Sequence, residues 1–128
     1  IMVRVDSVGT TGSGARVGVM IRDSLSPSAR YAFLGLTADG SVRWMARSSS
    51  NNRTTQVVPS GKVSGSWVKL VRRGKAVTGY VSKDGVKWTQ VRSLSISMAA
   101  NVYCGLAVAS GSPGALNAAC FANPVAVP

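Results

Sequence analysis

Few residues of this chain have side chains that could perform acid–base or nucleophilic chemistry. The sequence has no His and no Glu, and its carboxylates are Asp6, Asp23, Asp39 and Asp84. Glycoside hydrolysis by its usual route needs two carboxylates that face each other across the scissile bond. Asp39 and Asp84 each precede a glycine, a pair typical of turns. The other two lie near Arg4 and Arg22, which favours ion pairing, so all four are predicted to be structural.

Nucleophilic and metal-dependent catalysis also lack the groups they need. A serine nucleophile would have no histidine base, although a lysine base stays an alternative. A zinc site would have only two cysteines and scattered aspartates as ligands. We therefore expect a protein that is not an enzyme and that uses no metal and no cofactor.

The charge of the chain points to anionic partners. Its 15 Lys and Arg residues against 4 Asp give a net charge of +11. Such a charge favours nucleic acid, lipopolysaccharide, acidic polysaccharide or an acidic protein surface. The basic residues are spread along the sequence, apart from the group Arg72-Arg73-Gly74-Lys75, and no nucleic-acid-binding motif is recognisable. Specific nucleic-acid binding is not expected, and binding driven by charge alone stays an alternative.

Short alternating segments between clusters of Gly, Ser, Asn and Asp are typical of an antiparallel β-sandwich. We expect one all-β domain over residues 1–128, which could be a piece of a longer module. No apolar run reaches the ~18 residues of a membrane-spanning helix, so no span is expected. The expected strands are 1–8, 16–22, 30–37, 41–47, 54–58, 66–72, 76–82, 87–92, 102–109 and 116–122.

Three two-residue loops predict how the strands are paired. The loops are expected at Asp39-Gly40, Arg73-Gly74 and Asp84-Gly85, because glycine adopts the positive φ that tight hairpins need. The opposed pairs would be Gly35 with Trp44, Leu70 with Val77, Trp67 with Tyr80 and Val81 with Trp88. Alternation along the strands then directs one set of side chains into the core, namely Val68, Leu70, Val77, Val81 and Trp88. Trp44 is also expected in the core.

The opposite face of the same strands carries the best candidate for a binding site. Trp67 and Tyr80 are predicted to lie there among Lys and Thr side chains, where their rings could stack on a sugar or contact a protein. Arg47 and Arg72 are the candidate donors to sugar hydroxyls or acidic groups. The alternative is that a loop or another strand covers the two rings.

The two cysteines are predicted to form a disulfide. In a hairpin centred on Ser112, Cys104 and Cys120 would lie directly opposite each other, within bonding range. Such a bridge would fit an oxidising compartment and stabilise the fold by ~3 kcal/mol. The alternative is a pair of buried free thiols, because Cys104 alternates with apolar residues.

The chain resembles the concanavalin-A-like (laminin-G-like) jelly-roll domain of bacterial secreted proteins, the regulation-of-enolase type. The matching segments are Val17–Leu25, Trp44 with Arg47, Trp67–Arg72 with Gly74, Tyr80–Trp88, Val102–Ala107, and Phe121 with Asn123. This resemblance implies a non-catalytic extracellular or cell-surface module with a carbohydrate-binding or adhesive role. It transfers no catalytic residue.

The chain departs from the family in two places. Ala122 stands where the family has an Asp, and the family's first strands would lie before Ile1. Without those strands, unpaired backbone and apolar surface are expected to be exposed, and such edges recruit another strand. The alternative function is therefore a structural subunit of a fibre, sheath or virion surface. Its strands would be completed by a second copy or by a strand-donating partner chain, and the tail 125–128 is one candidate strand.

Overall fold

The structure is a computed structural model that describes residues 1–8, 15–49, 54–57, 65–109 and 119–125. These residues form strands and loops, with no helix among them. The strands are β1 (Met2–Val8), β2 (Arg16–Arg22), β3 (Tyr31–Thr37), β4 (Val42–Arg47), β5 (Thr55–Val57), β6 (Trp67–Arg73), β7 (Ala76–Ser82), β8 (Thr89–Ser95), β9 (Tyr103–Ala109) and β10 (Ala119–Val125).

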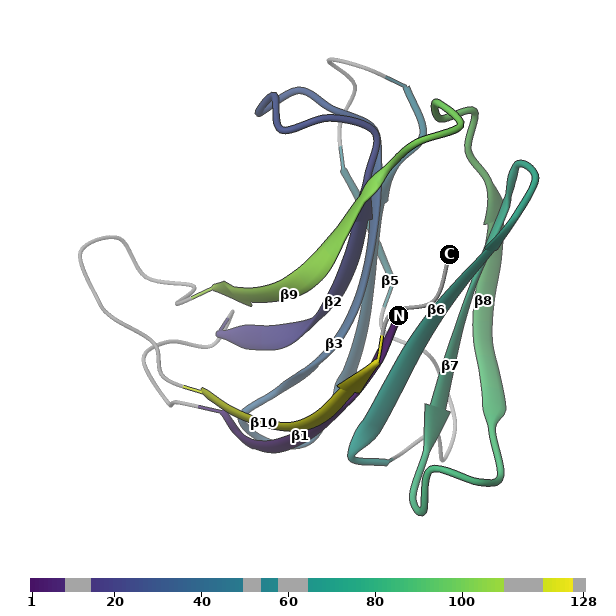
Figure 1. Cartoon of the computed structure of the whole chain (residues 1–128). Helices are drawn as coiled ribbons and strands as arrows, with labels where there is room; N and C mark the ends of the chain where they lie inside the picture. Colours follow the sequence, from purple (N-terminus) through teal and green to yellow (C-terminus); the bar gives the residue numbers. More distant parts are fainter. Residues whose placement is uncertain (9–14, 50–53, 58–64, 110–118, 126–128) are drawn as a thin grey trace.

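The strands form two antiparallel sheets that pack against each other (Figure 1). The first sheet has the order β10-β1-β6-β7-β8, and the second has the order β5-β4-β3-β2-β9. The expected antiparallel β-sandwich is therefore confirmed. Each expected strand has a counterpart whose ends lie within about three residues of the predicted ends. Strand boundaries are the least certain part of such a prediction.

The core lies between the sheets and follows the alternation of the strands. Along β4, Val42, Trp44 and Ala46 are buried while the residues between them are half-buried. The predicted inward direction of Val68, Leu70, Val77 and Val81 is confirmed, because all four are at most 1% exposed. Trp44 is fully buried, as expected.

Gly79 on β7 makes room for the indole of Trp44 from the opposite sheet. A Cβ at position 79 would lie 3.0 Å from Cζ3 of Trp44 and 3.0 Å from Cδ2 of Leu34. The expected role of Gly35 is wrong, because Gly35 faces Arg43 and Leu34 faces Trp44. The β3–β4 loop has three residues, with Gly40 at φ 84, and Thr37 N–H donates to the Ser41 carbonyl at 2.9 Å.

The β6–β7 hairpin is displaced by two residues from the predicted pairing. Gly74 and Lys75 form the loop, so that Leu70 faces Gly79, Trp67 faces Ser82 and Lys69 faces Tyr80. Gly74 has φ 59, the conformation that places the turn there. A displacement by two residues keeps every side chain on its predicted face, because the period of a strand is two.

The β7–β8 connection is wider than the predicted two-residue loop. Val81 faces Thr89 and not Trp88, and the register shifts between Gly79 and Tyr80. Oδ1 of Asp84 accepts hydrogen bonds from the N–H groups of Val86 and Lys87, at 2.8 and 2.9 Å, which opens the turn. The prediction that Trp88 points into the core is therefore wrong, and its ring is half-buried on the outer face.

The predicted cysteine pairing is also wrong. Cys104 lies on β9 opposite Ile21, whereas Cys120 lies on β10 opposite Ser7, in the other sheet. Cys104 is a free, exposed thiol. The expected hairpin was centred on residues outside the described part, and the strands on either side of it join different sheets. The free thiol of Cys104 therefore gives no support for an oxidising compartment.

We predict that Gly79→Ala destabilises the protein by about 1–3 kcal/mol, because the added methyl group must displace the Trp44 ring or the Leu34 side chain. Gly105→Ala on β9 is the matched control, because its Cβ would meet no atom within 4 Å. Urea unfolding of both variants measures the difference. Equal stabilities would contradict this account of the core.

Candidate ligand-binding site

An aromatic cluster lies on the outer face of the first sheet. Trp67 and Lys69 point outward from β6, and Tyr80 points outward from β7, because their neighbours on each strand fill the core. Trp88 joins them from the end of the β7–β8 loop. All four side chains are half-buried. We call these four residues the aromatic face.

The β7–β8 loop is held against the aromatic face by its own polar groups. The Ser82 hydroxyl donates to Oδ1 of Asp84 at 3.0 Å and accepts from Gly85 N–H at 2.9 Å. Gly85 has φ 78 and lies against the indole of Trp67, where a Cβ would come within 2.9 Å of the ring. Glycine is therefore required here for its conformation and for its lack of a side chain.

Two cations lie over these rings. Nζ of Lys69 is 5.0 Å from the centroid of Tyr80 and 4.1 Å from the centroid of Trp88. The Arg4 guanidinium is 5.9 Å from the Trp67 centroid and forms an ion pair with Asp6 at 2.8 Å, which confirms that expected pair. Burial against the rings lowers the pKa of Lys69. The cluster thus offers aromatic surface with a hydrogen-bond donor at its centre.

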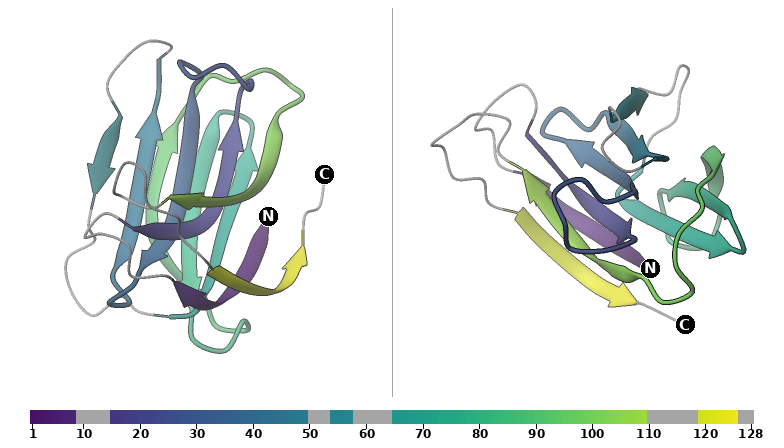
Figure 2. Two further views of the ribbon diagram at one scale, coloured as in Figure 1. Left: turned by 90° about the vertical axis from the view of Figure 1, so that its left-hand side faces the viewer. Right: turned by 90° about the horizontal axis from the view of Figure 1, so that it is seen from above.

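The outer face of the second sheet carries a different set of side chains. The guanidinium groups of Arg22 and Arg47 lie 5.5 and 5.4 Å from the centroid of Tyr31. Both also donate to backbone carbonyls of the loop before β3, Arg22 to Ser26 at 2.6 Å and Arg47 to Pro27 at 2.7 Å. Figure 2 (left) views this face, on which β9 and β2 bend along their length.

A small pocket of about 150 Å³ opens on this second face. Met20, Phe33 and Met45 line it with apolar surface, and Arg16 lies at its wall. Arg43 projects outward from the neighbouring strand β4, and its Nε is buried without a hydrogen-bond partner among the described residues. We call the outward residues of β2, β3 and β4 the arginine face.

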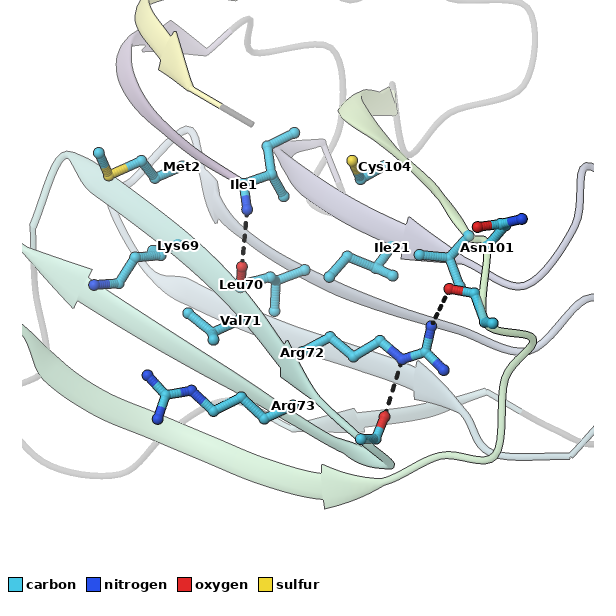
Figure 3. A pocket seen from close by; sticks show the side chains of 13 residues that line it. Ile1, Met2, Ile21, Lys69, Leu70, Val71, Arg72, Arg73, Asn101 and Cys104 are labelled. Carbon is cyan, nitrogen blue, oxygen red and sulfur yellow. Dashed lines mark hydrogen bonds between the residues drawn. The ribbon is translucent and has the colours of Figure 1, made fainter. Parts of the chain in front are cut away.

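A larger apolar cleft, of about 1010 Å³, lies where β6 of one sheet approaches β9 of the other (Figure 3). Ile21, Leu70, Val102 and Cys104 line it. Arg72 forms one wall and donates to the carbonyls of Met98, Ala99 and Gly74 at 2.9, 2.6 and 3.0 Å. These bonds attach the β8–β9 connection to β6.

The predicted site residues are distributed over three parts of the molecule. Trp67 and Tyr80 share the aromatic face as diagonal neighbours, with Lys69 between them. Arg47 lies on the opposite side of the sandwich, and Arg72 lies at the cleft, so neither joins the rings. Sequence reasoning missed Trp88 because it assumed a two-residue loop. It missed the pocket because the outer face of β3 was not considered.

The four carboxylates all have local partners. Asp23 accepts a hydrogen bond from Ala99 N–H at 2.7 Å and pairs with Arg30, not with the expected Arg22. Asp39 and Asp84 are held within their turns, and Asp6 pairs with Arg4. None of them lines either of the two pockets described above. The described residues also include no group of three potential metal ligands.

Comparisons with family models, curated proteins and solved structures gave no match to this chain. The resemblance to the concanavalin-A-like family therefore stays a prediction. In the described part of the chain, no helix has the length and apolar character needed to cross a membrane.

We predict that stability falls as the pH drops below about 4. Hydrogen bonds from the Thr37 hydroxyl and the Ser41 backbone lower the pKa of Asp39 to about 2, and the Ala99 and Lys87 N–H groups lower the pKa of Asp23 and Asp84. Because the folded state binds these protons less tightly, its stabilisation is complete above the ordinary pKa of 3.8 and is lost as the pH falls through the folded values.

Thermal unfolding midpoints between pH 7 and pH 2 measure this effect. In Asp39→Asn the unfolding midpoint should fall less steeply below pH 4 (the acid limb of the profile), because the asparagine side chain does not titrate. An acid limb equal to that of the wild type would show that Asp39 does not contribute to it.

Proposed function

We propose that this protein is a non-catalytic carbohydrate-binding module that recognises glycan through the aromatic face. The observation that supports this proposal is the gathering of Trp67, Tyr80 and Trp88 around one lysine on an outer sheet surface. Aromatic rings combine a large apolar area with few rotatable bonds, which suits them to bind the C–H faces of a pyranose. The ammonium of Lys69 would donate to a sugar hydroxyl.

The surroundings of the rings favour a preformed site. Packing against Gly85 fixes the Trp67 indole, and the hydrogen-bonded loop between β7 and β8 fixes the position of Trp88. A site that is already ordered loses little conformational entropy when the ligand binds. The four aspartates are bound to their own partners and form no acid–base pair. We therefore propose that the protein binds glycan without cleaving it.

We expect Trp88→Ala to weaken glycan binding about tenfold or more, because truncation of a central aromatic residue in a binding surface costs on the order of 2 kcal/mol. Trp67→Ala and Tyr80→Ala should act in the same direction. The measurement is a glycan array followed by titration calorimetry with the best neutral glycan.

Val86→Ala is the matched control, because Val86 lies in the same loop and is 78% exposed. Circular dichroism separates loss of binding from loss of fold. If no glycan binds the wild type, or if all three aromatic variants bind as the control does, the proposal is wrong.

A second candidate function, assembly into a larger structure, has its own supporting observation in the edges of the sheets. Edge strands are usually protected by charge, proline, bulges or short length. β5 has three residues, β8 contains Arg92 and pairs through a shifted register, and β10 contains Pro124. β9 has seven residues with no charge, no proline and a regular register.

The inner face of β9 is also uncovered. Leu106 and Val108 pair with Val19 and Val17, so they point to the core side of their sheet. Val17 and Val19 are fully buried, yet Leu106 and Val108 are 42% and 47% exposed. An added strand from a second copy would bond to the β9 edge and bring apolar cover to this surface.

If assembly is the function, the wild type should form dimers or larger species at micromolar concentration in light scattering coupled to size exclusion. Leu106→Lys should shift the population to monomer, because it places a charge on the core side of the edge strand. Val86→Lys is the control with the same charge change at another exposed site. A wild type that stays monomeric would exclude assembly through β9.

A further inference from the structure

We propose that the glycan bound at the aromatic face is an acidic polysaccharide, extended along β6, with one of its carboxylate or sulfate groups bound by Arg73. This inference rests on the proposed function and names the class of its ligand. Trp67 and Arg73 stand at the two ends of β6, about 20 Å apart at a rise of about 3.3 Å per residue. A single sugar ring cannot span this length, so the ligand must be a chain of several sugars.

Arg73 lies on the same surface of the sheet as the aromatic face. Lys69, Val71 and Arg73 extend to one side of β6 in Figure 3, whereas Leu70 and Arg72 extend to the other side. The alternation of a strand causes this arrangement, because residues two apart share a face. Lys69 belongs to the aromatic face, so the outward row of β6 continues from there through Val71 to Arg73.

The Arg73 side chain is available to bind a ligand. It is exposed, and it makes no hydrogen bond, ion pair or ring contact among the described residues. Its neighbour Arg72 is instead bonded to backbone carbonyls on the inner side of the strand. Ala76, which faces Arg73 on β7, is exposed and short, and β1 pairs with β6 only at residues 67–69, so neither neighbouring strand covers Arg73.

No carboxylate of the chain's aspartates neutralises Arg73. The four aspartates are held by other partners: Asp6 by Arg4, Asp23 by Arg30, Asp39 within the β3–β4 turn and Asp84 within the β7–β8 loop. Lys75, in the loop that follows Arg73, adds a second exposed cation at this end of the row. An anionic group of the ligand would therefore meet uncompensated positive charge, and the planar guanidinium can bind it through two parallel bonds.

The middle of the outward row carries hydroxyl groups without charge. Thr78 of β7 faces Val71 and Ser93, and its hydroxyl lies 2.9 Å from the hydroxyl of Ser93. Such groups can donate to and accept from sugar hydroxyls. Single-stranded nucleic acid is bound by a positive groove that follows its whole backbone. The cations on the β6 row stand only at Lys69 and Arg73, about 13 Å apart at about 3.3 Å per residue, which favours a saccharide with fewer charges.

The test is a binding titration of the full chain with three matched pairs of polymers. They are polygalacturonate and its methyl ester, alginate and its methyl ester, and dextran sulfate and dextran. Each pair shares a backbone and differs in charge. We expect at least one acidic polymer to bind about tenfold more tightly than its neutral form at low salt, and added salt should narrow the difference. No preference for the acidic form in any pair would overturn the proposal.

Arg73→Gln should weaken binding of the acidic polymer about tenfold and leave binding of the neutral form unchanged, because it removes a charge-assisted hydrogen bond. Arg73→Lys should restore part of the loss, since it keeps the charge. Arg92→Gln is the matched control, because Arg92 is exposed but pairs with Gly79 of the inward row of β7. Equal losses in Arg73→Gln and Arg92→Gln would overturn the site and leave only unspecific charge attraction.

Trp88→Ala separates this inference from the proposed function. It should weaken binding of both members of a pair, because both would use the aromatic face. A loss in Trp88→Ala without one in Arg73→Gln would keep the aromatic face and overturn the role of Arg73. A loss in Arg73→Gln without one in Trp88→Ala would overturn the extended chain. Tighter binding of single-stranded DNA than of every acidic polysaccharide would overturn the ligand class.

Discussion

The contact between Trp44 and Gly79 is the constraint on which the rest of the structure depends. The indole comes from the second sheet, and the absent side chain of Gly79 in the first sheet allows it to fit. This contact sets the distance between the layers, and it leaves the indole N–H buried without a hydrogen-bond partner in the described part of the chain. Burial of the large ring must outweigh that cost of about 1–3 kcal/mol. Because β7 and β4 are fixed by this contact, the residues that alternate with Gly79 and Trp44, including Tyr80 and Arg43, must point to the two outer faces.

Arginine side chains hold several loops of this fold in place through hydrogen bonds. Arg22, Arg47 and Arg72 each donate to several backbone carbonyls of a neighbouring loop. These bonds satisfy carbonyls that no strand partner reaches, and they do so without a carboxylate. The consequence is electrostatic, since the positive charges that hold the loops are not neutralised in the process. A chain that needs few acids for its own stability therefore presents a strongly positive surface to its surroundings.

The sequence predicted the strands and their faces well, because these depend on alternation, which survives a change of partner. Leu70 stays in the core although its partner is Gly79 and not Val77. The pairings themselves were wrong, because they depend on loop geometry. Gly74, Gly40 and Gly85 each have a positive φ, but they occupy different positions in loops of different length. Trp88 shows the effect on the site: Val81 pairs with Thr89 and not with Trp88, and this register shift of one residue moves Trp88 from the expected core to the aromatic face. Cys104 and Cys120 were misplaced because nothing in their spacing reveals that the two strands join different sheets.

The two sheets do not cover each other completely. The uncovered inner surface lies along the β9 edge. β9 extends the second sheet beyond the region where β6 and β1 cover it, which leaves Leu106 and Val108 exposed beside the apolar cleft at Ile21 and Leu70. An added strand would contact the β9 edge and the inner surface of its sheet. The aromatic face lies on the outer surface of the other sheet, whereas the pocket on the arginine face is lined in part by Ala107, Val108 and Ala109 of β9. Ligand binding on the aromatic face and strand addition at the β9 edge therefore use different surfaces, so evidence for one is not evidence against the other. A protein of this shape can be joined to a larger structure through β9 while its aromatic face stays open to solvent.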